Sequence, residues 1–167
     1  MKELILLNPE NATTREVATY RVRKAARAVV VDGEGTIALI HVSEHNYYKL
    51  PGGGLEGDED AVTALERECR EEIGCDIEVT AELGTVTEYR KISELNQTSY
   101  CYVAKLVGEK GATDLTESEI ERGFKTVWLS YDEAMKALTE HTATSIQGAL
   151  YIVPRDSAIL KEAKEYL

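Results

Sequence analysis

The segment that decides the fold is residues 50–75, LPGGGLEGDEDAVTALERECREEIGC, a glycine-rich stretch followed by a helical pattern. The glycines Gly52–Gly54 permit tight backbone turns and leave backbone amides and carbonyls accessible. From Asp60 to Ile73 the apolar positions recur at steps of three and four residues, which predicts an amphipathic helix that Gly74 ends. The expected apolar face of this helix consists of Val62, Leu65, Cys69 and Ile73.

Three glutamates share one sector of the predicted helix. With Glu68 at the origin of a helical wheel, Glu72 lies about 40° to one side and Glu71 about 60° to the other. Like charges at these spacings destabilise a helix, so a compensating cation is expected. Mg²⁺ and Mn²⁺ prefer oxygen ligands and are commonly held by a few carboxylates together with substrate phosphates. A solvated acidic helix face is the alternative interpretation of the same pattern.

The charge of the chain limits the classes of partner. The 167 residues carry a net charge of −11, which argues against a protein that coats nucleic acid. Residues 56–72 hold −6 of this charge, whereas residues 18–27 contain four bases and no acid. The apolar run Leu4–Leu7 is too short for a signal peptide, and no run approaches the roughly 18 residues that span a bilayer. Three cysteines without a CxxC pair are typical of reduced thiols, so a cytoplasmic protein without a membrane partner is expected.

The rest of the chain alternates between strand and helix patterns. Strands are expected at residues 27–32, 36–42, 47–50, 77–83, 100–106 and 127–129. The first two flank an Asp-Gly hairpin turn, and a Ser130–Glu133 capping box opens a helix that continues to Leu138. Helical patterns follow at residues 146–153 and after Pro154. This order predicts an α/β or α+β sandwich around a mixed sheet, in one domain over residues 1–167. Its core covers about 25–140, and a C-terminal helical extension covers about 142–167.

The helix and its preceding loop carry a motif. Gly53, Glu59 and the run from Arg67 to Cys75, at their observed spacings, resemble the Nudix box GX5EX7REUXEEXGU, in which U is apolar. Every fixed position agrees, and cysteines occupy the two U positions. One departure is Asp58, where the family usually has glycine; here the glycine stands one residue earlier, at Gly57. The resemblance covers about residues 25–140.

The resemblance implies the Nudix α/β/α sandwich and a hydrolase that cleaves a nucleoside diphosphate linked to another moiety by metal-activated attack of water on phosphorus. Carried over by position, Glu68, Glu71 and Glu72 are the implied ligands of Mg²⁺ or Mn²⁺. The carbonyl of Gly52 is implied to assist them, and Glu56 to lie near the metal. The implied structural residues of the motif are Gly53, Glu59 and Gly74, with Arg67 holding the carboxylates in place.

Several roles stay open at this stage. The general base is Glu71 or Glu72, or a loop acid among Glu117, Glu119 and Glu121. Arg23 and Arg27 are candidates to balance substrate phosphate charge, although both also suit an ordinary surface. Tyr48, or its neighbour Tyr47, is a candidate to stack on a nucleobase or to fill the core.

Two other functions on the same fold are alternatives. A catalytically silent nucleotide-sensing or protein-binding module typically lacks one or more of the box carboxylates, and this chain has them all. An isomerase of isoprenoid diphosphates needs a further catalytic cysteine, whereas Cys69 and Cys75 occupy apolar box positions. The expected partner is therefore a small nucleotide rather than nucleic acid, and a homodimer is left open.

Overall fold

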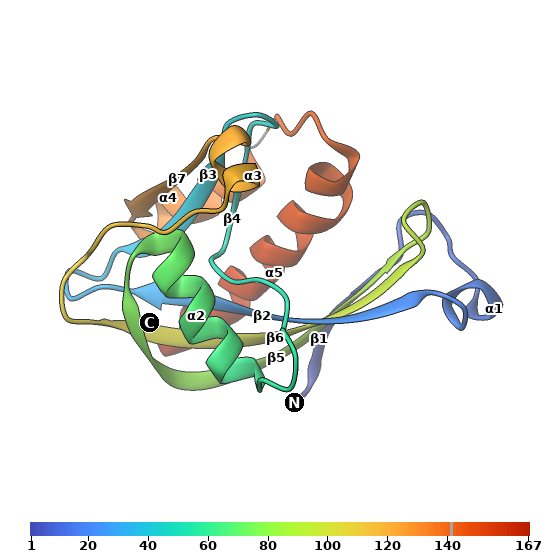
Figure 1. The fold of residues 1–167 in the computed structure, drawn as a ribbon, viewed down its shortest axis with the longest axis horizontal. Helices are drawn as coiled ribbons and strands as arrows, with labels where there is room; N and C mark the ends of the chain where they lie inside the picture. The colour runs from blue at the N-terminus through green and yellow to red at the C-terminus, as the bar shows by residue number, and fades with distance from the viewer. Residues whose placement is uncertain (141) are drawn as a thin grey trace.

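The computed structural model describes residues 1–140 and 142–167 and contains one seven-stranded mixed sheet with helices on both faces (Figure 1). The strands are β1 (Glu3–Leu7), β2 (Arg21–Val31), β3 (Ile37–Val42), β4 (Tyr47–Lys49), β5 (Asp76–Arg90), β6 (Leu95–Val107) and β7 (Phe124–Leu129). The α-helices are α1 (Thr14–Val17), α2 (Ala61–Ile73), α3 (Glu117–Glu121), α4 (Tyr131–Thr139) and α5 (Val153–Ala163). A π-helical turn, η1 (Gly148–Ile152), precedes α5, and a 3₁₀ turn, η2 (Lys164–Tyr166), follows it.

The strand order is β1-β5-β6-β2-β3-β4, and β7 pairs with β3. The pairs β1–β5 and β2–β6 are parallel and the other pairs are antiparallel. Alternate residues of β2 face two different cores: Ala26 and Ala28 pack with α2, whereas Val29 packs with α4 and α5. The mixed α+β class and the α/β/α layering predicted from the sequence are therefore confirmed. None of the helices in the described residues is long and apolar enough to cross a membrane.

Helix α2 begins and ends where its sequence signals lie. The Asp60 side chain accepts a hydrogen bond from the Thr63 backbone N–H (2.8 Å), and Gly74 adopts the left-handed conformation that closes the last turn. The prediction that Val62 belongs to the apolar face is wrong, because its side chain is exposed. The buried arc of the helix is turned toward Ala64, since Glu72 is buried beside a cation on that side.

The glycine loop replaces a missing strand pair. β2 and β3 pair only at Val31 and Ile37, and residues 51–55 run along the free edge of β2 instead. The N–H of Ala26 donates to the Gly53 carbonyl (2.9 Å), which holds the loop against the sheet. Gly52 has a φ of 124°, and a Cβ at this position would lie 2.2 Å from the Ala26 carbonyl oxygen. Only glycine fits there.

Strands β5 and β6 are longer than predicted. They extend to Arg90 and from Leu95, and with the start of β2 they form a twisted ribbon that projects from the body and ends beside α1 (Figure 1). The alternation of apolar residues stops early because this ribbon carries charged and polar side chains on the face that continues the core. The sheet register, not local hydrophobicity, defines these ends.

The C-terminal helices also differ from the expectation. Pro154 does not separate two helices, because η1 continues directly into α5 and Pro154 stands in the first turn of α5. Ile159, Leu160 and Ala163 face the core as predicted, whereas Ile146 and Leu150 are exposed.

Candidate active site

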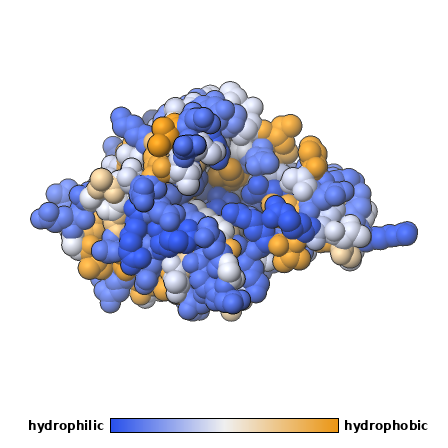
Figure 2. Space-filling model, in the orientation of Figure 1, coloured by the Kyte–Doolittle hydropathy of each residue, from blue (hydrophilic) through white to orange (hydrophobic). Residues whose placement is uncertain are grey.

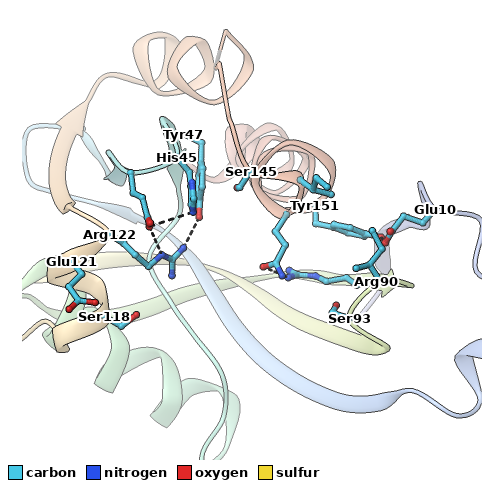
Figure 3. A pocket seen from close by; sticks show the side chains of 14 residues that line it. Glu10, His45, Tyr47, Arg90, Ser93, Ser118, Glu121, Arg122, Ser145 and Tyr151 are labelled. Carbon is cyan, nitrogen blue, oxygen red and sulfur yellow. Dashed lines mark hydrogen bonds and ion pairs between the residues drawn. The ribbon is translucent and has the colours of Figure 1, made fainter.

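Two cavities adjoin each other, and the inner one lies beside the glycine loop. The inner cavity, about 330 Å³, is bounded by the loop, α2 and the start of α5. The outer cavity, about 680 Å³, lies between the ribbon, α3 and η1. They share Tyr47, Arg90, Arg122 and Gln147 as lining residues. Figure 2 shows this face of the molecule hollowed near its centre, and Figure 3 shows the outer cavity with Arg122 and Arg90 on opposite sides.

Arg67 gathers four carboxylates. Its Nη1 lies 3.1 Å from Glu68 Oε1, 3.3 Å from Glu71 Oε2 and 3.9 Å from Glu56 Oε1. Its Nη2 donates to Glu59 Oε1 (2.8 Å) and to the Gly54 carbonyl (3.0 Å). The hydrogen bond to Glu59, with the other carboxylates, raises the pKa of Arg67 above its ordinary value, so the guanidinium stays charged. Arg67 thus fixes the helix carboxylates relative to the glycine loop.

Glu72 belongs to a separate arrangement. Its Oε1 lies 2.5 Å from Lys49 Nζ, and its Oε2 accepts a hydrogen bond from the Gly52 N–H (2.8 Å). Lys49 is 9% exposed and Glu72 is 3% exposed, so this ion pair is buried. The Lys49 Nζ also lies 4.7 Å from the centre of the Phe124 ring. The Glu72 side chain therefore connects helix α2 to the glycine loop through the backbone N–H of Gly52.

The chemistry of this acidic set fits a hard divalent cation. Burial, and then repulsion from Glu72, raises the pKa of Glu68 above its ordinary value, and a bound cation would relieve that repulsion. A Cβ on Gly53 would lie 2.0 Å from Glu68 Oε1, so glycine keeps the loop close to the carboxylate. Within the described residues no three acidic, histidine or cysteine side chains form a ready-made metal cage. Carboxylates that supplement water and phosphate oxygens are nevertheless the usual setting for Mg²⁺.

Two arginines in the inner cavity have no acidic partner. Within the described part of the chain, no carboxylate lies within 4.0 Å of the guanidinium group of Arg23 or of Arg27. The Arg23 guanidinium donates a hydrogen bond to the Gln97 side chain, and the Arg27 guanidinium donates one to the Ala26 carbonyl. Arg27 is 6% exposed, and its Nε has no hydrogen-bond partner among the residues that the structure describes. Burial, with repulsion from Arg155, lowers the pKa of Arg27 to about 10. A buried guanidinium that contacts no carboxylate favours an anionic ligand.

Comparison with known proteins identifies the family. The NUDIX domain family model matches residues 21–148. The chain belongs to the NUDIX family. A MutT-like protein of Streptomyces ambofaciens is 29% identical over 149 residues, which cover 88% of this chain and 86% of the relative.

Solved structures share the Nudix fold at low identity. A NUDIX hydrolase from Nitrosomonas europaea has a TM-score of 0.59 and 17% identity, over 81% of this chain and 88% of that one. The MutT protein from Methanosarcina mazei has a TM-score of 0.58 and 16% identity, over 89% and 97% of the two chains. The expectation of a Nudix pyrophosphohydrolase agrees with these comparisons.

The structure brings most of the predicted residues of this Nudix domain together. The inner cavity is lined by Glu68, Glu72, Arg23, Arg27 and the glycine loop. Arg67 connects Glu56, Glu59 and Glu71 to Glu68 from outside the described lining of that cavity. Glu119 lines the inner cavity, but its Oε2 accepts a hydrogen bond from the Thr116 N–H (2.8 Å) that caps α3. Glu121 lines the outer cavity.

Tyr48 lies elsewhere. Its ring stacks on His41, with 4.6 Å between the ring centroids, and it does not appear among the described residues that line the two cavities. Because side chains alternate along β4, Tyr47 points to the cavities instead, and its hydroxyl accepts a hydrogen bond from Arg122 Nη2 (3.0 Å). Figure 3 shows these two side chains in contact.

Sequence reasoning missed the support that α5 gives to the loop. Asp156 is fully buried, and its Oδ2 accepts a hydrogen bond from the Leu50 N–H (2.9 Å). Arg155 Nε donates to Asp156 Oδ1 (2.7 Å), and Arg155 Nη1 lies 3.6 Å from Glu88 Oε2. The signal was present as acidic and basic residues at alternate positions of β5, Glu88 and Arg90, which mark a charged sheet face that needs partners.

Proposed function

We propose that this protein is a divalent-metal-dependent pyrophosphohydrolase that cleaves the diphosphate linkage of a nucleoside diphosphate joined to another moiety. The observation that carries the proposal is the composition of the inner cavity. Glu68 and Glu72 of the complete Nudix box line it together with Arg23 and Arg27, whose guanidinium groups donate to neutral acceptors and contact no carboxylate within the described residues. Carboxylates for a cation and guanidinium groups for phosphates thus border one space.

Three helix carboxylates would hold the metal. Glu68, Glu71 and Glu72 would bind Mg²⁺ or Mn²⁺, with help from the Gly52 carbonyl and with Glu56 directly or through water. When bound, the metal would lower the pKa of a water molecule and offset the charge of the diphosphate. Arg67 acts as the positioning residue, because it fixes Glu68 and Glu71 relative to the loop through Glu59 and Gly54.

The remaining side chains orient the substrate and move protons. Arg23 and Arg27 would bind phosphate oxygens, and Tyr47 at the border of the two cavities would contact the nucleoside. Water forms a bond to phosphorus, the bridging oxygen leaves with its electron pair on the departing phosphate, and a carboxylate accepts the proton of the water. We favour Glu71 or Glu72 of the box helix as this base, and Glu117, Glu119 and Glu121 are the other candidates.

Paired variants of α2 test the proposal. Glu71→Gln removes a carboxylate whose side chain is 38% exposed and contacts Arg67, so the fold should persist while metal-dependent turnover falls about 100-fold or more. Glu66→Gln makes the same change on the same helix but outside the Arg67 set, since Glu66 lies 3.9 Å from Arg70. Metal-dependent hydrolysis rates of both variants measure turnover, and their circular dichroism spectra measure whether the fold persists. Equal activity of Glu71→Gln and Glu66→Gln would contradict the proposal.

A further inference from the structure

The two cavities meet at a neck that is formed by four side chains, Tyr47, Arg90, Arg122 and Gln147. They come from four separate segments: strand β4, the end of β5, the residue after α3 and the residue before η1. Arg122 and Arg90 stand on opposite sides of the outer cavity (Figure 3). A substrate that occupies both cavities must cross the neck, so the chemistry of the neck restricts what can follow the scissile diphosphate.

The Tyr47 hydroxyl is available to the neck as a hydrogen-bond donor. Its oxygen accepts a hydrogen bond from Arg122 Nη2 (3.0 Å), which leaves the phenolic proton for another group. Burial raises the pKa of Tyr47 above its ordinary value, so the hydroxyl keeps this proton at neutral pH. The side chain is 1% exposed, and its surroundings therefore hold the hydroxyl in place.

Gln147 and Arg90 also present donors. Arg90 Nη1 donates to the Gln147 side-chain oxygen (3.5 Å), so the amide protons of Gln147 remain for a ligand. Arg90 is 8% exposed, and its Nη2 donates to Glu88 (2.9 Å). Its Nε has no hydrogen-bond partner among the residues that the structure describes. Arg90 thus has fewer acceptors than donor protons, which is costly for a buried guanidinium.

Arg122 supplies a charge that a ligand can reach. Its Nε lies 3.8 Å from Glu44 Oε2, and its Cζ lies 5.1 Å from the centre of the Phe124 ring. The Arg122 side chain is 37% exposed, and an exposed ion pair at this distance contributes little. The guanidinium is therefore free to exchange Glu44 for a stronger acceptor.

The neck as a whole is rich in donors and contains no acid. A phosphate in a chain matches it, because such a phosphate offers several charged acceptor oxygens. A sugar hydroxyl would bring a proton that needs an acceptor of its own. Arg23 and Arg27 would already bind the scissile diphosphate in the inner cavity, so the neck remains for a further group.

We propose that the neck binds a third phosphate and that the protein selects nucleotides with three or more consecutive phosphates. Nucleotide sugars and ADP-ribose, whose chains end after two phosphates, leave the neck without an anion. The outer cavity, about 680 Å³, then holds the nucleoside beyond the third phosphate. This inference rests on the proposed function, because it takes the inner cavity as the place of the scissile diphosphate.

Calorimetric binding of inorganic diphosphate and tripolyphosphate, in chelator, tests the neck without a nucleobase. We expect the wild type to bind tripolyphosphate at least about tenfold more tightly, and Arg122→Gln to lose most of this advantage. Tyr47→Phe, which removes only the hydroxyl, should lose part of it. Arg15→Gln, exposed on α1 and outside the described lining of both cavities, should keep it. Equal affinities for the two anions in the wild type, or an advantage that survives Arg122→Gln, would overturn the inference.

Hydrolysis rates in Mg²⁺ give a second measurement that separates specificity from folding. The pairs ATP and ADP-ribose, GTP and GDP-mannose, and UTP and UDP-glucose each share one nucleoside. We expect kcat/KM to be at least about tenfold higher for the triphosphate, and Arg122→Gln to remove this preference mainly through KM. A merely structural role of Arg122 would lower the rates for both members of a pair alike, and that result would contradict the proposal.

A carboxylate on an attached sugar could supply the same negative charge as a third phosphate. UDP-glucuronate and UDP-glucose differ by this carboxylate, and we expect their affinities to agree within about twofold. A tenfold preference for UDP-glucuronate that disappears in Arg122→Gln would overturn the assignment to a phosphate chain.

Failure of the proposed function has a separate signature. If the domain binds nucleotides without hydrolysing them, no nucleotide is cleaved but the preference for tripolyphosphate over diphosphate persists. If nucleotide sugars or ADP-ribose are cleaved faster than triphosphates, the proposed function stands and the role of the neck is wrong.

Discussion

Buried charge is tolerated in this protein because individual residues find specific partners. Glu88 is fully buried on β5 and is surrounded by Arg90 at 2.9 Å, Arg155 at 3.6 Å and the Gln97 amide. Burial alone would raise the pKa of Glu88, but Arg155 and Arg90 outweigh it and hold that pKa below the ordinary 4.5. Glu88 thus stays ionised and neutralises part of the arginine-rich wall behind the inner cavity.

A pH dependence of stability follows from Glu88. Because its folded pKa is lower than its unfolded pKa, its contribution to stability is complete above about pH 4.5 and is lost as the pH falls through the folded pKa. Glu88→Gln should lower the unfolding free energy at neutral pH by about 3 kcal/mol. It should also reduce the fall of the melting temperature with decreasing pH, which is the acid limb of the plot of melting temperature against pH. Thermal melts between about pH 3 and 7 measure both effects.

The control is Glu82→Gln, on the same strand but exposed, which should keep the wild-type acid limb. Parallel curves for the wild type and Glu88→Gln would show that Glu88 does not contribute to acid sensitivity.

At the scale of elements, the glycine loop is held from two sides. Glu72 of α2 accepts the Gly52 N–H, and Asp156 of α5 accepts the Leu50 N–H, so carboxylates from two helices bracket Pro51. Figure 1 shows α2 and α5 on either side of the segment that joins β4 to α2. The C-terminal helix therefore supports the position of the Gly52 carbonyl.

Asp156→Asn should weaken the attachment of the glycine loop to α5. The substitution leaves Arg155 without the buried carboxylate that it contacts at 2.7 Å, so we expect a loss of about 3 kcal/mol in unfolding free energy. The folded fraction should also turn over substrate more slowly, because the loop is less ordered. Denaturant unfolding and rates per folded molecule measure these effects. Glu162→Gln, on the same helix at its contact with Lys2, is the control. Wild-type stability and rate in Asp156→Asn would exclude a role for Asp156 in supporting the glycine loop.

Across the whole molecule, local patterns predicted the elements that carry their own signals. The helix from the Asp60 cap to Gly74, the Asp-Gly hairpin and the Ser130 capping box are each encoded within a few residues. Strand ends in the ribbon were not predictable, because Glu88, Arg90 and Gln97 look like surface residues in the sequence. They are buried only when β5 pairs with β6, β6 pairs with β2, and α5 packs against the sheet.

The same distinction holds for the site. Arg67 and the box glutamates lie within 23 residues of one another, and their fixed spacing revealed them. Asp156 acts on Leu50 from 106 residues away, and Lys49 meets Glu72 from 23 residues away across a strand and a helix. Those contacts depend on how α2 and α5 pack on the sheet, which residue spacing alone does not define. Tyr47 and Tyr48 could not be distinguished without the register of β4.

The central claim is that this Nudix domain hydrolyses a diphosphate linkage with the help of a divalent metal. The most direct measurement is product chromatography over a panel of nucleoside triphosphates, nucleotide sugars, ADP-ribose and dinucleoside polyphosphates, with Mg²⁺, with Mn²⁺ and with chelator. We expect at least one member to yield a nucleoside monophosphate only when metal is present. Intact nucleotides throughout the panel, in a folded protein that still binds Mn²⁺, would contradict the claim and indicate a module that binds without turnover.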